Sequence, residues 1–128
     1  MERYNPNETP NPEEWLELSE FERIDLVEEF HEKSDDSLNL KDNQAKLHAS
    51  VHVTVENQIA QGLEPVLETI DRLIREGLDR HDAVHAVGAV VAENIFAMMR
   101  GKQSSWNEKS YGKRLRKLTA KRFLKGVY

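Results

Sequence analysis

The chain has 128 residues, the size of one domain with a buried core. It contains no cysteine, which excludes disulfides, thiolate metal sites, iron–sulfur clusters and thiol nucleophiles and fits a reducing cytosol. No apolar run approaches the roughly 20 residues of a membrane span, and the N-terminus lacks the basic and then apolar start of a signal peptide. We therefore expect a soluble cytoplasmic protein with no membrane partner.

The net charge of −5 hides a strong segregation along the chain. Residues 1–36 hold thirteen acidic and three basic side chains (−10), residues 37–99 hold nine and five (−4), and residues 100–128 hold one and ten (+9). Ends of opposite charge can pair within one chain or between the two chains of a homodimer, and these are the roles we favour for the basic end. The negative total disfavours general nucleic-acid binding, which would need residues 109–125 as a local basic patch.

Helix-start signals, in which a capping side chain precedes a proline or an acidic residue, recur along the chain. They are Asn11 with Pro12, Ser19 with Glu22, Pro65, and Asp79 with Asp82. Glycines that follow apolar periodic segments mark helix ends, at Gly62, Gly77 and Gly101. These signals predict helices that begin near residues 12, 19, 42, 65, 80 and 111, with a polar connection over residues 34–39.

The predicted fold class is all-α, a compact helical bundle of about five to six helices with short loops, because no segment alternates with a period of two. Residues 1–11 contain turn formers and few apolar side chains, which predicts a flexible N-terminal tail. Residues 12–101 are predicted to form the bundle domain, and residues 102–128 a basic C-terminal helical extension.

Histidines stand at helical spacing in this sequence. His48 and His52 are four residues apart, as are His81 and His85, and His31 lies alone upstream. Imidazole is the commonest metal ligand and titrates near neutral pH, so the direction in which these side chains point matters.

The helical wheel directs the first histidine pair inward. At about 100° per residue, His48 and His52 fall at the centre of the apolar face of their helix, with Glu56 next along the same stripe. His81 and His85 lie beside the apolar face of their own helix, in line with small residues that let a neighbouring helix come close.

Connection lengths place the histidines relative to one another. Short loops around Gly62 and Gly77 predict that three successive helices run up, down and up, so that the two histidine-bearing helices are parallel. His31 ends the preceding helix and is expected at the same end of the bundle. All five imidazoles are therefore expected to converge.

The candidate metal ligands are His31, His48, His52, Glu56, His81 and His85. They would make a nitrogen-rich site for Zn²⁺, Fe²⁺, Mn²⁺ or Ni²⁺. Glu56 would be a ligand, a general base, or the carboxylate that orients a histidine. Such a site would suit a metal-dependent hydrolase, a redox protein or a sensor, and the sequence assigns no catalytic residue.

Two other interpretations stay open. The histidines could bond to one another, to Glu56 and to backbone carbonyls, and so fix the helix register of a non-catalytic interaction or dimerisation module. The basic C-terminal helix of such a module would bind the partner. The dipeptide His81-Asp82 is also typical of the HD phosphohydrolases, which are helical metal enzymes, but Asp82 is better explained as a helix-capping acid.

The chain resembles a family of small bacterial all-helical domains with the motifs LHAxxH, ENQxA and RHDAxH. The resemblance covers roughly residues 13–97, and its matching residues are Trp15, Glu22, Arg23, Ile24, His31, Leu47, His48, Ala49, His52, Val55, Glu56, Asn57, Gln58, Ile59, Ala60, Arg72, Leu73, the run from Gly77 to Ala83, His85 and Ala86. It implies a compact helical domain and brings no established activity with it. The basic tail lies outside it.

Overall fold

The computed structural model describes residues 1–33, 42–102 and 105–126. These residues form seven helices and no strand, which confirms the all-α class. The helices are α1 (Pro12–Glu17), α2 (Glu20–Lys33), α3 (Asp42–Ala60), α4 (Glu64–Arg75), α5 (Arg80–Met99), α6 (Glu108–Lys117) and α7 (Ala120–Leu124). The polar connection predicted at residues 34–39 lies outside the described residues.

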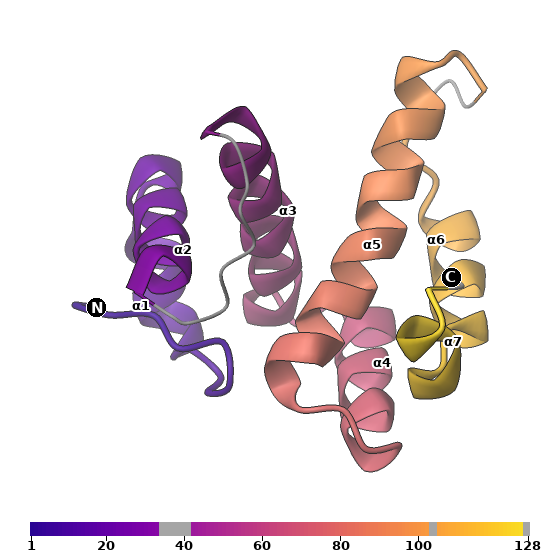
Figure 1. Ribbon diagram of the computed structural model, residues 1–128, viewed down its shortest axis with the longest axis horizontal. Helices are drawn as coiled ribbons and strands as arrows, with labels where there is room; N and C mark the ends of the chain where they lie inside the picture. Colours follow the sequence, from indigo (N-terminus) through magenta and orange to yellow (C-terminus); the bar gives the residue numbers. More distant parts are fainter. Residues whose placement is uncertain (34–41, 103–104, 127–128) are drawn as a thin grey trace.

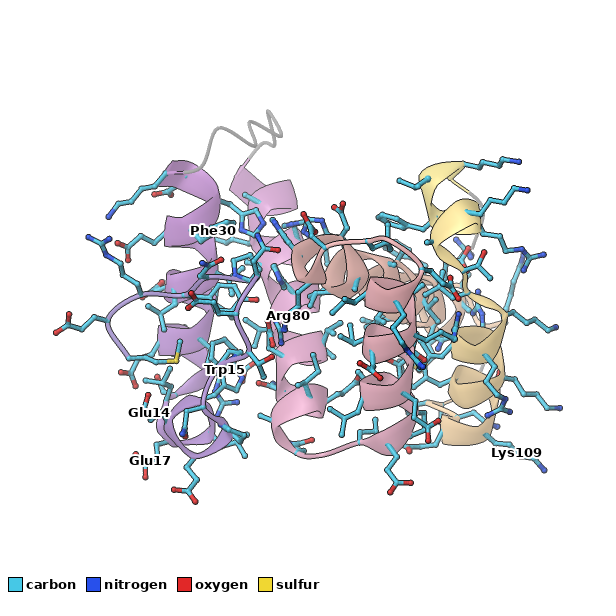
Figure 2. All side chains as sticks on the ribbon, turned by 90° about the horizontal axis from the view of Figure 1, so that it is seen from below. Glu14, Trp15, Glu17, Phe30, Arg80 and Lys109 are labelled. Atoms are coloured by element: carbon cyan, nitrogen blue, oxygen red, sulfur yellow. The ribbon has the colours of Figure 1, made fainter. Side chains whose placement is uncertain are left out.

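Helix α5 is the central element of the bundle. It packs against α3 on one side and against α4 and α6 on the other, while α1 and α2 cover the outer face of α3 (Figure 1). The acidic helices α1 and α2 thus lie on the opposite side of the molecule from the basic helices α6 and α7. Figure 2 shows the same separation in single side chains, since Glu14 and Glu17 project at one end and Lys109 at the other.

The capping signals form as the sequence predicts. Ser19 and Glu22 make a reciprocal capping box: the backbone N–H of Ser19 donates to Glu22 Oε1 at 2.9 Å and the N–H of Glu22 donates to Ser19 Oγ at 3.2 Å. Asp79 caps α5 by accepting from the N–H of Asp82 at 2.8 Å. Glycine ends α3 and α4, where Gly62 and Gly77 have φ of 75° and 113°, a conformation that L side chains rarely adopt.

Two separate groups of apolar residues fill the interior. The larger one joins α3, α4, α5, α6 and α7, and its buried members are Val55, Val66, Ile70, Leu73, Leu78, Ala83, Val84, Ala86, Val87, Val90, Val91, Tyr111, Leu115, Leu118 and Ala120. The smaller one lies between α1, α2 and α3 and consists of Tyr4, Trp15, Val27, Ala49 and Val53. The histidine rings lie where α2, α3 and α5 meet.

The N-terminal segment, predicted to be a flexible tail, packs against the bundle. Tyr4 is 4% exposed and belongs to the smaller apolar group. The Pro6 carbonyl accepts from Arg80 Nη1 at 2.8 Å, and Asn7 Oδ1 accepts from the backbone N–H of His81 at 3.1 Å. Sequence patterning missed this because a single tyrosine among turn formers has no periodicity to reveal it.

The basic C-terminal region is also part of the packed bundle. Tyr111 and Leu115 of α6 are buried in the larger apolar group. Arg114 forms an ion pair with Glu93 of α5, and the Leu115 carbonyl accepts from Arg72 Nη2 at 3.0 Å. One basic side chain of this region is therefore paired with the central helix α5 of its own chain.

Helix α5 is long and apolar enough, by length and composition alone, to cross a membrane. It is not an uninterrupted apolar run, since it contains Arg80, Asp82 and Glu93. In the bundle α5 packs against three other helices, and the same composition is expected of a central core helix.

The two histidine-bearing helices run in opposite senses, so the prediction that they are parallel is wrong. Glu56 of α3 pairs with Arg80 at the start of α5, whereas His48, two turns earlier in α3, contacts His85 further along α5. Gly88 allows their close approach, since a Cβ atom at this position would lie 3.0 Å from Val51 Cγ1. The histidines still converge because each pair lies near the point where the helices cross.

Candidate metal centre

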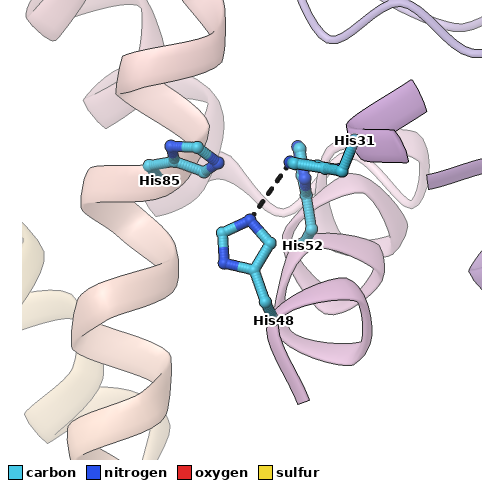
Figure 3. A group of neighbouring side chains, drawn as sticks. All are labelled: His31, His48, His52 and His85. Carbon is cyan, nitrogen blue, oxygen red and sulfur yellow. Dashed lines mark hydrogen bonds between the residues drawn. The ribbon is translucent and has the colours of Figure 1, made fainter. Parts of the chain in front are cut away.

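Four histidines from three helices form one cluster. His31 comes from the last turn of α2, His48 and His52 from α3, and His85 from α5. Each offers one ring nitrogen such that all four nitrogens lie within 4.8 Å of one another. Figure 3 shows their rings turned toward a common centre. The predicted convergence of these four imidazoles is confirmed.

The fifth histidine, His81, borders this cluster without belonging to the four-nitrogen group. Its ring centroid lies 4.2 Å from that of His85 and 5.5 Å from that of His52, with which it stacks. Phe30 meets the edges of His31 and His81 at centroid distances of 5.3 and 5.4 Å. His81 and Phe30 thus form a wall of the site.

Hydrogen bonds orient two of the clustered rings. His31 Nδ1 lies 2.8 Å from the carbonyl oxygen of Val27, which can only accept, so Nδ1 carries a proton and the other nitrogen of a neutral His31 ring accepts. That other nitrogen, Nε2, lies 3.1 Å from His48 Nε2 (Figure 3). In the metal-free protein one proton bridges these two nitrogens.

Two ring nitrogens of the clustered histidines are buried without a hydrogen-bond partner among the residues that the structure describes. They are His52 Nδ1 and His85 Nε2. A buried polar atom left without a partner costs about 1–3 kcal/mol. Such atoms are rare in folded proteins, and two of them within one group of side chains need an explanation.

Burial favours the neutral form of three of the clustered rings. Together with the charges of neighbouring histidines, it lowers the pKa of His48 from the usual 6.5 to about 4 and that of His85 to about 3. The same causes hold the pKa of His52 well below its usual value. Neutral imidazole is the form that binds a metal ion, so these three rings need not lose a net charge before binding.

Glu56 is placed beside the cluster and is engaged by other partners. Its two carboxylate oxygens accept from Arg80 Nη1 and Nη2 at 2.8 Å each, and it also accepts from the Tyr4 hydroxyl. Glu56 and Arg80 are 1% and 8% exposed. The sequence places Glu56 among the candidate ligands; in the structure it lies outside the four-nitrogen group and reaches His52 through Tyr4.

Tyr4 connects this buried ion pair to the cluster. Its hydroxyl oxygen lies 3.0 Å from His52 Nε2 as well as within hydrogen-bond distance of Glu56. Burial and the adjacent Glu56 charge raise the pKa of the Tyr4 hydroxyl well above its ordinary value, so it keeps its proton. Sequence reasoning missed both Tyr4 and Arg80, whose roles depend on contacts 48 and 24 residues distant in the chain.

The ENQ motif of α3 is a set of structural anchors to three different parts of the fold. Glu56 holds Arg80 of α5. Asn57 accepts at Oδ1 from Trp15 Nε1 at 2.9 Å and from an arginine of α2. Gln58 accepts from the Tyr111 hydroxyl of α6 at 2.7 Å. Glu56 and Asn57 therefore tie α5 and α2, which carry histidines, to α3, whereas Gln58 ties α6 to it.

The cluster's dimensions suit a single transition-metal ion. Ligands about 2.0–2.1 Å from a tetrahedral zinc are about 3.3 Å apart, close to the 3.1 Å between the Nε2 atoms of His31 and His48. The most distant nitrogens, within 4.8 Å of each other, would approach by side-chain rotation. Four neutral nitrogen donors fit Zn²⁺, Fe²⁺, Mn²⁺ or Ni²⁺ and do not fit the oxygen preference of Ca²⁺ or Mg²⁺.

Comparison with known proteins adds no assignment. No family model, curated protein or solved structure matches this chain. The resemblance to the small bacterial helical domains therefore stays a prediction.

Proposed function

We propose that this protein binds one divalent transition-metal ion at the cluster of His31, His48, His52 and His85. The observation that supports this most strongly is the meeting of four imidazole nitrogens from three helices, of which two are buried without a partner among the described residues. A metal ion would satisfy both of these nitrogens at once. Hydrogen bonding among the rings alone leaves them unsatisfied.

The donor set limits the chemistry of the bound ion. All four ligands are neutral, and the nearest buried carboxylate, Glu56, is neutralised by Arg80. The ion would keep its full double charge in a partly buried site, which favours a water or small anion as an additional ligand. A tetrahedral zinc would be closed by four histidines, whereas octahedral iron, manganese or nickel would keep two positions open for hydrolytic or redox chemistry.

A competing interpretation treats the histidines as a structural network. It draws support from the bond between His31 and His48 and from that between His52 and Tyr4. It predicts that removing a ring weakens the fold without changing any metal content. The two interpretations therefore differ in a measurable quantity.

The test is the metal stoichiometry of protein made without a histidine tag, measured by elemental analysis after loading and desalting. The expected result is about one equivalent of transition metal and a raised thermal midpoint on loading. His85→Ala removes one of the four converging nitrogens and is expected to abolish stoichiometric binding.

His81→Ala is the matched control. It removes a neighbouring buried ring on the same helix that lies outside the four-nitrogen group, so we expect it to retain about one equivalent. Less than a few tenths of an equivalent in the wild-type protein, with no thermal shift, would contradict the proposal. Equal loss in both variants would show that the four-histidine assignment is wrong.

A further inference from the structure

The hydrogen bonds around Tyr4 determine which nitrogen of His52 faces the metal centre. Glu56 receives two hydrogen bonds from the guanidinium of Arg80 at 2.8 Å each. A carboxylate in this bidentate arrangement is ionised and can only accept. The Tyr4 hydroxyl, which lies against Glu56 Oε2, must therefore donate its single proton to that oxygen.

The direction of that bond decides the next one. Because the only proton of Tyr4 goes to Glu56, its oxygen can only accept from His52 Nε2, 3.0 Å away. His52 Nε2 must then carry the ring proton. In a neutral imidazole the other nitrogen, Nδ1, is left with a lone pair.

That second nitrogen is the one that the fold leaves available. His52 is 2% exposed, and its Nδ1 is buried without a hydrogen-bond partner among the described residues. The chain from Arg80 through Glu56 and Tyr4 thus points the lone pair of His52 into the cluster. The remaining bonds of the N-terminal segment hold Tyr4 in place, since Arg80 Nη1 also donates to the Pro6 carbonyl at 2.8 Å.

We propose that Tyr4 is a positioning residue of the metal centre: held by the Glu56–Arg80 ion pair, it fixes His52 in the Nε2–H tautomer, so that Nδ1 is the atom that binds the ion. This proposal rests on the proposed function and deepens it. It makes the N-terminal segment, which precedes the first helix, a part of the metal centre. Partners of this kind, which hold the non-coordinating N–H of a histidine ligand, typically change metal affinity about 10- to 100-fold when removed.

The first measurement needs no variant. The ring-nitrogen resonances of His52 in ¹⁵N-labelled, metal-free wild-type protein distinguish the two neutral tautomers. We expect a protonated Nε2 and an unprotonated Nδ1. An Nδ1–H tautomer, or an equal mixture of the two, would overturn the proposal.

The second measurement uses Tyr4→Phe, which removes the hydroxyl and keeps the ring. The expected result is a mixture of His52 tautomers in the metal-free protein and a metal affinity lowered about 10- to 100-fold in competition with a chromophoric chelator. The matched control is Tyr111→Phe, which removes another buried hydroxyl, bonded to Gln58 at 2.7 Å and belonging to the larger apolar group. It is expected to leave both readouts unchanged.

The two proposals fail in different ways. If Tyr4→Phe binds metal as tightly as Tyr111→Phe and keeps the Nε2–H tautomer, Tyr4 does not position His52 and this inference is wrong, although the metal site stands. If the wild-type protein binds no metal, the proposed function fails. The tautomer of His52 in that same protein still decides whether the Tyr4 hydrogen bonds act as argued.

Discussion

The two halves of the molecule are stabilised by different kinds of interior. The half built from α4, α6, α7 and the later turns of α5 encloses an almost wholly aliphatic core. Its buried polar side chains are satisfied locally: Thr69 donates to the Pro65 carbonyl at 2.7 Å, and Asn94 accepts from Arg114 at 2.6 Å. The half built from α1, α2, α3 and the start of α5 instead surrounds a buried ion pair and a group of imidazoles.

The aliphatic half mainly stabilises the fold, whereas the half with the histidines contains the candidate binding site. An aliphatic core gains stability from burial alone, whereas every buried polar group costs free energy unless it is bonded. The half with the histidines tolerates ring nitrogens such as His52 Nδ1 and His85 Nε2 that have no bond among the described residues. Buried polar atoms that lower stability at one place in a well-packed fold indicate a binding site.

The largest loss of stability in the half with the histidines is expected from Arg80→Met, which removes one member of the buried ion pair. It leaves Glu56, at 1% exposure, as an uncompensated charge. Breaking such a pair typically destabilises a protein by about 3–5 kcal/mol. Urea unfolding of the metal-free protein measures the change, and we expect metal affinity to fall as well, since Tyr4 loses its fixed partner.

Leu73→Ala provides the comparison in the other half. Leu73 is fully buried in the aliphatic core, so its truncation is expected to cost about 2–5 kcal/mol. The metal stoichiometry should stay unchanged while the protein is folded. If Leu73→Ala reduced metal binding as much as Arg80→Met does, the two halves would not be separable in this way.

A change of stability with pH is expected chiefly from the half with the histidines. The pKa of His48 is lowered from 6.5 to about 4 and that of His85 to about 3, so the unfolded chain takes up protons that the folded chain does not. The metal-free protein should therefore lose stability as the pH falls from about 6.5 toward 4, by at most about 1.4 kcal/mol per pH unit for each histidine.

Urea unfolding in the presence of a chelator at several pH values measures this slope. His48→Gln should reduce this slope, because the unfolded variant has one histidine fewer that takes up a proton as the pH falls. Leu73→Ala should lower the stability at every pH and leave the slope as it is. A wild-type stability that does not change between pH 6.5 and 4 would contradict the burial of neutral histidines.

The sequence reveals those features that depend on local spacing. Helix starts follow from single capping residues such as Ser19 and Asp79, and the inward stripe of His48 and His52 follows from four-residue spacing on an apolar face. Both predictions needed only neighbouring residues. The fold class and the histidine cluster could therefore be predicted before any coordinates were known.

What the sequence conceals depends on contacts between distant segments. Nothing near Tyr4 indicates that it enters the core, and nothing near Glu56 indicates that Arg80, 24 residues later, takes up its carboxylate. The relative direction of α3 and α5 was predicted wrongly because short loops fix which helices are neighbours and leave their crossing angle to packing. Gly88 contributes to that packing, since a Cβ atom there would lie 3.0 Å from Val51 Cγ1 of α3.

The most direct test of the metal site is the X-ray absorption spectrum of the wild-type protein loaded with zinc. Four histidines at one ion predict four nitrogen neighbours at about 2.0–2.1 Å, with the multiple scattering that imidazole rings produce. A shell dominated by water or carboxylate oxygen, with fewer than three imidazoles, would contradict the assignment of His31, His48, His52 and His85 as the ligands.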